Sequence, residues 1–138
     1  MREKAIICDL DGTLADIKHR DPFDASACLD DAVNKPIKNL INQYFNAGYK
    51  VIILSGRMDK YKKISEQWLL ENNIHYNKCY LRKTGDGRKD SIIKKEIYLK
   101  DIMPRYSIEF ILDDRNQVVD MWRKELNLVC FQVNYGDF

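Results

Sequence analysis

Short apolar runs alternate with longer amphipathic segments along the chain. Each run is rich in Ile, Val, Leu, Phe or Cys and has few polar interruptions, which is typical of parallel strands buried on both faces. The runs predict five strands, over Lys4–Asp9, Tyr49–Ser55, Asn77–Leu81, Ser107–Asp113 and Leu128–Val133.

Between the runs, apolar residues recur at the three- and four-residue spacing of a helix. This spacing predicts four helices, over Pro36–Ala47, about 59–72, about 90–103 and 116–126. Strand–helix alternation of this kind indicates an α/β protein. We therefore expect a Rossmann-like three-layer sandwich with a mostly parallel five-stranded sheet, formed by residues 1–138 as a single domain.

Residues 16–35 break the alternation. They are polar, contain Pro22 and follow neither the strand period nor the helix period. A long insertion between a first strand and a first helix is a candidate lid. We predict that about 16–35 form a small flap inserted after the first strand.

Composition places few limits on the function. The chain has 138 residues, with 23 Lys and Arg against 21 Asp and Glu, and a formal net charge of +2 is too small to indicate nucleic-acid or membrane binding. The cysteines, Cys8, Cys28, Cys79 and Cys130, lack the CxxC spacing of a metal clamp, so we expect reduced thiols and a cytoplasmic protein. No segment approaches the roughly 18 apolar residues of a membrane span, so no membrane association is expected.

Acidic side chains gather where predicted strands end. Asp9 and Asp11 come at the end of the first strand, and Asp113 and Asp114 at the end of the fourth. The polar stretch Ser55-Gly56-Arg57 follows the second strand. Because ligands of open parallel sheets bind beyond the carboxyl ends of the strands, we expect these residues to meet at one edge of the sheet.

Carboxylates that pack this closely repel one another unless a cation joins them. Several oxygen ligands favour Mg²⁺, and the isolated His19 and His75 offer no zinc site. A carboxylate beside Mg²⁺ can attack phosphorus and form an aspartyl-phosphate, and a second acid can protonate the leaving oxygen and then deprotonate water. The pattern therefore predicts a magnesium-dependent phosphatase.

The stretch Asp9-Leu10-Asp11-Gly12-Thr13-Leu14 resembles the first motif of the haloacid dehalogenase superfamily. The later motifs of that superfamily follow in order, with Ser55 after the second strand, a lysine at Lys94, and the pair Asp113-Asp114 after the fourth strand. The resemblance implies that Asp9 is the nucleophile and that Asp11 is the general acid and base. It implies that Ser55 binds the phosphate and that Lys94 neutralises Asp9 and the phosphoryl oxygens. The implied magnesium ligands are Asp9, the backbone carbonyl of Asp11, Asp113 and Asp114.

A narrower resemblance rests on six further stretches, which are Gly48–Val51, Ser55–Arg57, Gly85–Asp90, Asp113–Arg123, Cys130–Val133 and Gly136–Phe138. With them, essentially the full length resembles the 3'-phosphatase domain of phage-type polynucleotide kinase/phosphatase enzymes. This narrower resemblance implies that Arg20, Arg57 and Arg82 contact the phosphate or the nucleic-acid end. It implies that Asp90 orients neighbouring basic groups and that Arg115 supports the acidic pair. The implied substrate-binding residues are Thr13, Arg20, Ser55, Gly56, Arg57, Arg82, Asp90 and Arg115.

The chain has no GxxxxGK[ST] phosphate loop and no Gly-Lys pair, so we expect no kinase domain in it. The expected substrates are 3'-phosphorylated DNA or RNA ends, and a separate kinase or ligase is a candidate partner. Two alternatives stay open. One is a nucleotidase or another small-molecule phosphomonoesterase of the haloacid dehalogenase type, and the other is a non-catalytic module that binds nucleic-acid ends.

Overall fold

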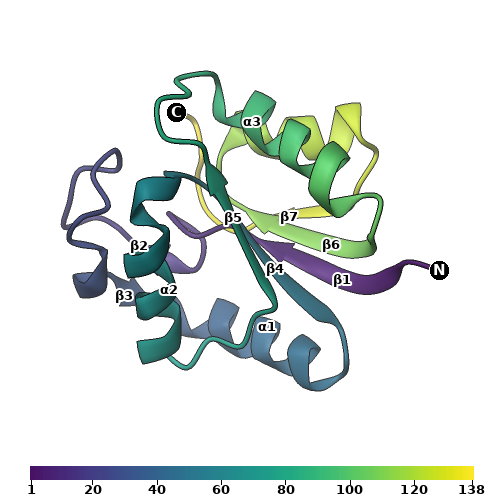
Figure 1. Ribbon diagram of the computed structural model, residues 1–138, viewed down its shortest axis with the longest axis horizontal. Helices are drawn as coiled ribbons and strands as arrows, with labels where there is room; N and C mark the ends of the chain where they lie inside the picture. The colour runs from purple at the N-terminus through teal and green to yellow at the C-terminus, as the bar shows by residue number, and fades with distance from the viewer.

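The computed structural model, which describes residues 1–138, has a five-stranded sheet at its centre (Figure 1). The strands of this sheet are β1 (Glu3–Cys8), β4 (Lys50–Met58), β5 (Lys78–Arg82), β6 (Tyr106–Asp113) and β7 (Cys130–Gln132). Their order is β5-β4-β1-β6-β7 and every neighbouring pair is parallel, which confirms the predicted sheet. The chain first adds strands on one side of β1 and then on the other. In sheets of this kind, ligands bind beyond the carboxyl ends of the strands where the order reverses.

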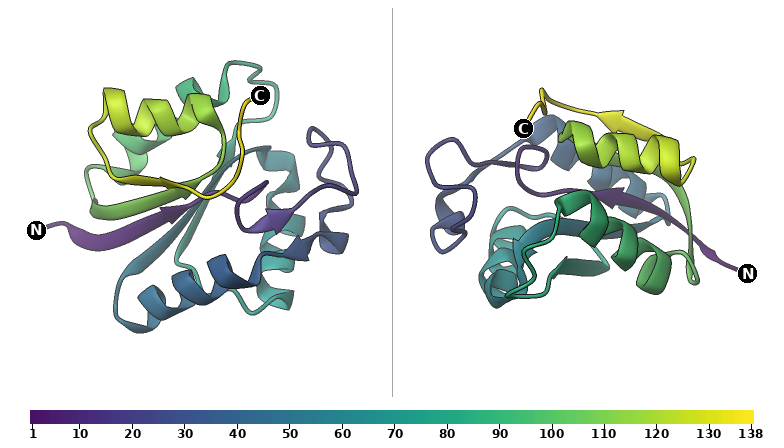
Figure 2. Two further views of the ribbon diagram at one scale, coloured as in Figure 1. Left: turned by 180° about the vertical axis from the view of Figure 1, so that it is seen from behind. Right: turned by 90° about the horizontal axis from the view of Figure 1, so that it is seen from above.

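Helices cover both faces of the sheet, as Figures 1 and 2 show. The helices α1 (Lys35–Asn46) and α2 (Lys62–Glu71) pack on one face, and α3 (Asp90–Ile97) and α4 (Asn116–Asp120) on the other. The 3-10 turn η2 (Asp59–Tyr61) precedes α2, and α3 and α4 continue into the π-helical turns η3 (Tyr98–Ile102) and η4 (Met121–Glu125). The predicted helical ranges therefore hold, but two of the helices end in wider turns than the spacing suggested.

The residues of β1 alternate between the two layers of the core. Ile6 and Cys8 pack in the cluster under α1 and α2, while Ala5 and Ile7 pack in the cluster under α3 and α4. Successive side chains of a strand point to opposite faces, so a strand that is covered on both faces must be apolar throughout. This requirement explains the continuous apolar run in the sequence.

The predicted flap leaves the sheet at the carboxyl end of β1. Its base is a two-stranded antiparallel sheet of β2 (Ala15–Asp16) and β3 (Ala32–Val33), and the turn η1 (Cys28–Asp30) precedes β3. Figure 2 shows the flap projecting from the sheet at the end away from the N-terminus. The predicted range of 16–35 starts and ends one residue late, since β2 begins at Ala15 and α1 begins at Lys35.

All four cysteines are buried and unpaired, as expected for reduced thiols. Burial raises the pKa of Cys79 and of Cys130 to about 12, which keeps these thiols protonated at neutral pH. None of the helices combines the length and the apolar character that a membrane span requires.

Candidate active site

Three buried carboxylates meet where β1 and β6 end. Asp9 directly follows β1 and its backbone N–H donates to the carbonyl of Leu112 at 3.0 Å, while Asp113 is the last residue of β6. Asp9, Asp113 and Asp114 are each at most 5% exposed, and one carboxylate oxygen from each lies within 4.8 Å of the others. Neighbouring parallel strands therefore bring together acids from the two ends of the chain, as the sequence predicts.

The ammonium group of Lys94, on α3, lies against this cluster. Its Nζ is 3.0 Å from Asp9 Oδ1 and 3.0 Å from Asp113 Oδ2, and the side chain is 1% exposed. Burial by itself would lower the pKa of Lys94, but the negative charges of Asp113, Asp9 and Asp90 raise that pKa well above its usual value. Lys94 is therefore a fixed positive charge beside Asp9.

The charge balance of the cluster fits a divalent cation. Three carboxylates face one ammonium group, and burial raises the pKa of Asp9 and of Asp114 because their charged forms are poorly solvated. A set of carboxylate oxygens without histidine or thiolate ligands suits Mg²⁺ better than zinc. Asp9, Asp113 and Asp114 are the side chains that can hold such an ion.

The two residues after Asp11 shape the same cluster. Thr13 Oγ1 lies 3.1 Å from Asp9 Oδ2 and 3.4 Å from Asp114 Oδ1, so its hydroxyl hydrogen serves one carboxylate at a time. Gly12 has a φ of +80°, and a Cβ at this position would overlap the carboxylate of Asp114. The Gly-Thr pair therefore allows Asp114 to approach β1 and orients Asp9.

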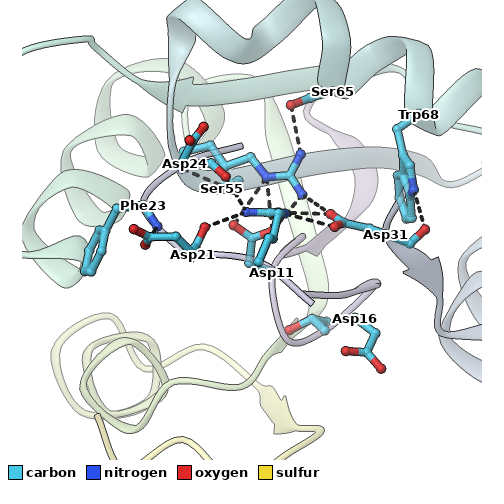
Figure 3. A network of polar contacts seen from close by, with 12 residues as sticks. Asp11, Asp16, Asp21, Phe23, Asp24, Asp31, Ser55, Ser65 and Trp68 are labelled. Carbon is cyan, nitrogen blue, oxygen red and sulfur yellow. Dashed lines mark hydrogen bonds and ion pairs between the residues drawn. The ribbon is translucent and has the colours of Figure 1, made fainter. Parts of the chain in front are cut away.

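The Asp11 carboxylate lies outside this cluster, in a network of arginines (Figure 3). Arg57 Nε and Nη2 are 3.0 and 2.6 Å from Asp11 Oδ1, and Arg20 Nη2 is 3.0 Å from the same oxygen. The Asp11 side chain is 21% exposed, whereas that of Arg57 is 1% exposed. Two arginines for which the resemblance implies contacts with the phosphate or the nucleic-acid end are thus bound to a carboxylate in this structure.

A buried aspartate of the flap, which the sequence analysis missed, also holds both arginines. Asp31 Oδ1 accepts from Arg20 Nε at 2.9 Å, and Asp31 Oδ2 lies 2.9 Å from Arg20 Nη2 and 3.3 Å from Arg57 Nη2. Two residues of α2 complete the network: Ser65 Oγ accepts from Arg57 Nη1 at 2.9 Å, and Trp68 Nε1 donates to the Asp31 carbonyl at 2.9 Å (Figure 3). The Asp31 carboxylate has no exposed surface, so the arginines are fixed from the interior.

β4 extends three residues beyond the predicted strand end, which corrects the placement of Ser55, Gly56 and Arg57. The sequence places this stretch after the strand, whereas β4 continues to Met58, with an irregular register against β5 between Ser55 and Met58. Ser55 is buried and its Oγ accepts from the Arg57 N–H at 3.2 Å. A Cβ at Gly56 would overlap the Asp90 carboxylate, so glycine permits the close approach of α3.

Arg82, at the end of β5, ties the following loop to β4. Its Nε donates to the Gly56 carbonyl at 2.9 Å, and its Nη1 donates to the carbonyls of Asp86 at 3.0 Å and Arg88 at 2.5 Å. These contacts place Arg82 at the wall of the site and engage its Nη1 with the loop.

Asp90 lies among three basic side chains at the start of α3. Its Oδ1 is 3.2 Å from Arg82 Nη2, and its Oδ2 is 3.8 Å from Lys94 Nζ and 4.0 Å from Arg115 Nη1. Arg115 also donates from Nε to the Phe138 carbonyl at 3.0 Å. In this structure Arg115 therefore contacts Asp90 and Phe138 rather than the carboxylates of the acidic pair.

A cleft of about 770 Å³ opens over these groups. Its floor includes Asp9, Asp11, Ser55, Arg57, Asp113 and Asp114, and its rim comes from the flap and from the loop between β5 and α3. The volume is in the range of sites for small organic ligands. The cleft can therefore hold a phosphate ester against a buried carboxylate, with cationic groups on either side of it.

The fold and the site together define a class of enzyme. An Asp-x-Asp stretch after the central strand, a buried lysine from α3 and an acidic pair at the end of β6 are the features of haloacid dehalogenase-type phosphatases. Comparison with known families is more specific: the family described as the polynucleotide kinase PNKP phosphatase domain matches residues 3–138. The chain belongs to this family.

Relatives of the chain are parts of larger proteins. Two solved structures, of a Pnkp1/Rnl/Hen1 complex and of the Pnkp1/Rnl/Hen1 RNA repair complex, each contain a chain 52% identical to this one with a TM-score of 0.97. They match 99% of this chain and 48% and 44% of their own. A protein of Autographa californica nuclear polyhedrosis virus, named for bifunctional polynucleotide kinase and RNA ligase activities, is 29% identical over 126 residues, covering 87% of this chain and 18% of the viral protein. This chain thus spans less than half the length of each of these relatives.

Proposed function

We propose that this chain is a magnesium-dependent polynucleotide 3'-phosphatase that acts through an aspartyl-phosphate intermediate. The observation that carries the proposal is the buried contact of Lys94 with both Asp9 and Asp113 beneath the cleft. Membership of the polynucleotide kinase phosphatase family supports a nucleic-acid end as the substrate.

Asp9 is the proposed nucleophile. Lys94 Nζ and Thr13 Oγ1, at 3.0 and 3.1 Å, hold its two oxygens in a defined orientation. One oxygen of Asp9 forms a bond to phosphorus while the bond between phosphorus and the 3' oxygen of the terminal sugar breaks. Asp11, two residues further on, donates a proton to that leaving oxygen.

Hydrolysis of the aspartyl-phosphate restores the site. A water oxygen attacks phosphorus, the bond from phosphorus to Asp9 breaks, and the Asp11 carboxylate accepts the proton of the water. Inorganic phosphate then leaves, and Asp11 is again protonated for the next cycle. Ser55 and Arg57 are the groups proposed to bind the phosphoryl oxygens, and Lys94 offsets their charge.

Asp9, Asp113 and Asp114, with the backbone carbonyl of Asp11, are the proposed ligands of Mg²⁺. When bound, the ion supplies positive charge that reduces repulsion between the carboxylates and the anionic substrate. This role agrees with the cluster of three buried carboxylates and one ammonium group.

The proposed substrates are 3'-phosphorylated DNA or RNA ends. Arg20, Arg82 and Arg115 lie around the site, and arginines near a cleft suit the flanking phosphates of a strand. Relatives are named for an RNA repair complex and for joined kinase and ligase activities, so a separate kinase or ligase is the proposed partner.

The test is phosphate release from one oligonucleotide in two forms, phosphorylated at its 3' end or at its 5' end, beside free 3'- and 5'-mononucleotides. Asp9→Asn and EDTA serve as blanks. We expect magnesium-dependent release with a strong preference for the 3' end of the polymer. Equal or better turnover of free 5'-nucleotides would instead identify a nucleotidase. Binding of the ends without any release would identify a non-catalytic module.

A further inference from the structure

The cleft is larger than a phosphate group needs, and aromatic rings line its outer part. Its volume of about 770 Å³ leaves room for the sugar and the base that carry the phosphate. Three aromatic side chains line it: Phe23 from the flap, Tyr61 from η2 and Phe138 from the C-terminal segment. An aromatic ring at such a position is a surface on which a nucleobase can stack.

Phe23 is the one ring of the three without a partner. The ammonium of Lys60 lies 5.1 Å from the ring centre of Tyr61, and the guanidinium of Arg115 lies 4.9 Å from that of Phe138. Phe23 takes part in none of the aromatic or cation–π pairs of the structure, and it is 82% exposed. Figure 3 shows its side chain projecting away from the arginine network, on the side opposite Trp68.

The loop that carries Phe23 is nevertheless well ordered by polar contacts. The Phe23 N–H donates to Asp21 Oδ1 at 2.9 Å, and the Ser26 N–H donates to Asp24 Oδ1 at 2.9 Å. Arg20 Nη1 lies 3.3 and 3.2 Å from the carbonyls of Asp21 and Asp24, on either side of Phe23. These local hydrogen bonds hold the loop, so the exposed Phe23 ring keeps its place at the edge of the cleft that it lines.

The same arginine connects this loop to the reacting groups. While Arg20 Nη1 contacts the two flanking carbonyls, Arg20 Nη2 lies 3.0 Å from Asp11 Oδ1. The position of the Phe23 ring is thus coupled, through one planar guanidinium, to the carboxylate that the mechanism uses as acid and base.

We propose that Phe23 is the stacking platform for the base of the 3'-terminal nucleotide, an inference that rests on the proposed function. Stacking on a flat ring face accepts every base, so this subsite would favour a nucleotide end over other phosphomonoesters without selecting a sequence. The ring replaces contact with water by contact with the base, which is the favourable direction for an exposed phenyl group.

The test compares two 3'-phosphorylated oligonucleotides that differ only in the terminal residue, one with a normal base and one abasic. Phe23→Ala is expected to raise KM for the normal end by about 5- to 150-fold, the effect of losing one stacked base, and to have little effect on the abasic end. Phe23→Tyr keeps the ring and should keep the preference for the normal end. Tyr135→Ala is the matched control, because Tyr135 is 98% exposed and lies outside the cleft, and it should change neither substrate.

Equal losses on the two substrates, or no loss on either, would overturn the stacking proposal. The affinity of the Asp9→Asn protein for the same two ends gives a second measurement that needs no turnover. If the wild-type protein releases no 3'-phosphate, the proposed function fails. The stacking proposal is then still decided by whether Phe23→Ala, in the Asp9→Asn protein, removes the preference for the end that carries a base.

Discussion

Asp9 and Asp11 lie two residues apart, but their carboxylates differ in burial and in the cations that they contact. Asp9 is buried and rests against an ammonium group that is itself buried, beside two further carboxylates. Asp11 is partly exposed and contacts Arg57 and Arg20, two of the groups proposed above to bind the phosphate or the nucleic-acid end. The comparison supports the proposed roles: Asp9, the proposed nucleophile, is held in place before substrate arrives, and Asp11, the proposed acid and base, can leave its ion pairs when phosphate competes for the arginines.

The largest expected effects distinguish the roles of Asp9 and Asp11, because the two variants should respond differently to the leaving group of the substrate. Asp9→Asn removes the proposed nucleophile and should reduce kcat by roughly 10⁴-fold or more on every phosphomonoester. Asp11→Asn removes the proposed acid, so it should reduce kcat about 10²- to 10⁴-fold on a sugar 3'-phosphate, whose leaving oxygen needs a proton. With nitrophenyl phosphate, whose leaving group needs none, Asp11→Asn should show a rapid first release of nitrophenolate followed by slow turnover.

Stopped-flow absorbance on nitrophenyl phosphate measures this difference directly. A burst equal to the enzyme concentration in Asp11→Asn means that the aspartyl-phosphate forms rapidly and that its hydrolysis is slow without the base. The assigned roles would be contradicted by the absence of this burst in Asp11→Asn, or by retained turnover in Asp9→Asn.

The next effect is on the free energy of unfolding, and it compares the buried ion pairs of Lys94 with the exposed ion pair of Lys95. Lys94→Met leaves Asp9 and Asp113 buried beside each other without their cation, which should cost about 3–5 kcal/mol of the free energy of unfolding in EDTA. Lys95→Met is the control, because the adjacent Lys95 makes an exposed pair with Glu125 at 2.9 Å, and its loss should cost only about 0–1 kcal/mol. Urea titrations of both variants, in EDTA and in magnesium, measure the difference.

Magnesium should return part of the stability of Lys94→Met if the three carboxylates bind it, because a divalent cation supplies the missing positive charge. The difference in unfolding free energy between Lys95→Met and the wild type should be the same in magnesium as in EDTA. Similar unfolding free energies for the two variants in EDTA would show that Lys94 is not the neutralising charge of the cluster.

The strands and the catalytic floor follow from the sequence because both depend on simple patterns. A strand covered on both faces must be apolar along its length, and strand ends of a parallel sheet must meet, so Asp9 and Asp113 are predictable neighbours. The end of β4 is not predictable in this way. Ser55, Gly56 and Arg57 have the composition of a loop, and they extend the strand because Arg82 of β5 holds the Gly56 carbonyl.

The arginine network could not be predicted from the sequence, because it depends on which aspartate of the flap is buried. Asp30 and Asp31 are neighbours of the same type in a segment without any period, yet Asp30 is exposed and Asp31 is buried. Only the packing of the flap against α2, where Trp68 donates to the Asp31 carbonyl, distinguishes them. The same packing explains why Arg20 and Arg57 contact carboxylates in the structure, whereas the family resemblance implied contacts with the phosphate or the nucleic-acid end.

The smallest effect tests whether this hidden aspartate acts through Asp11. Asp31→Asn keeps the volume of the side chain but weakens its hold on Arg20 and Arg57, and it should reduce kcat/KM on a sugar 3'-phosphate by up to roughly 10²-fold through misplacement. Asp30→Asn, one residue away and exposed, should leave kcat/KM unchanged. If Asp31 acts by positioning the acid, its loss should be smaller on nitrophenyl phosphate, as it is for Asp11→Asn. A purely structural role would lower the rates on both substrates alike, so the ratio of the two losses decides between these roles.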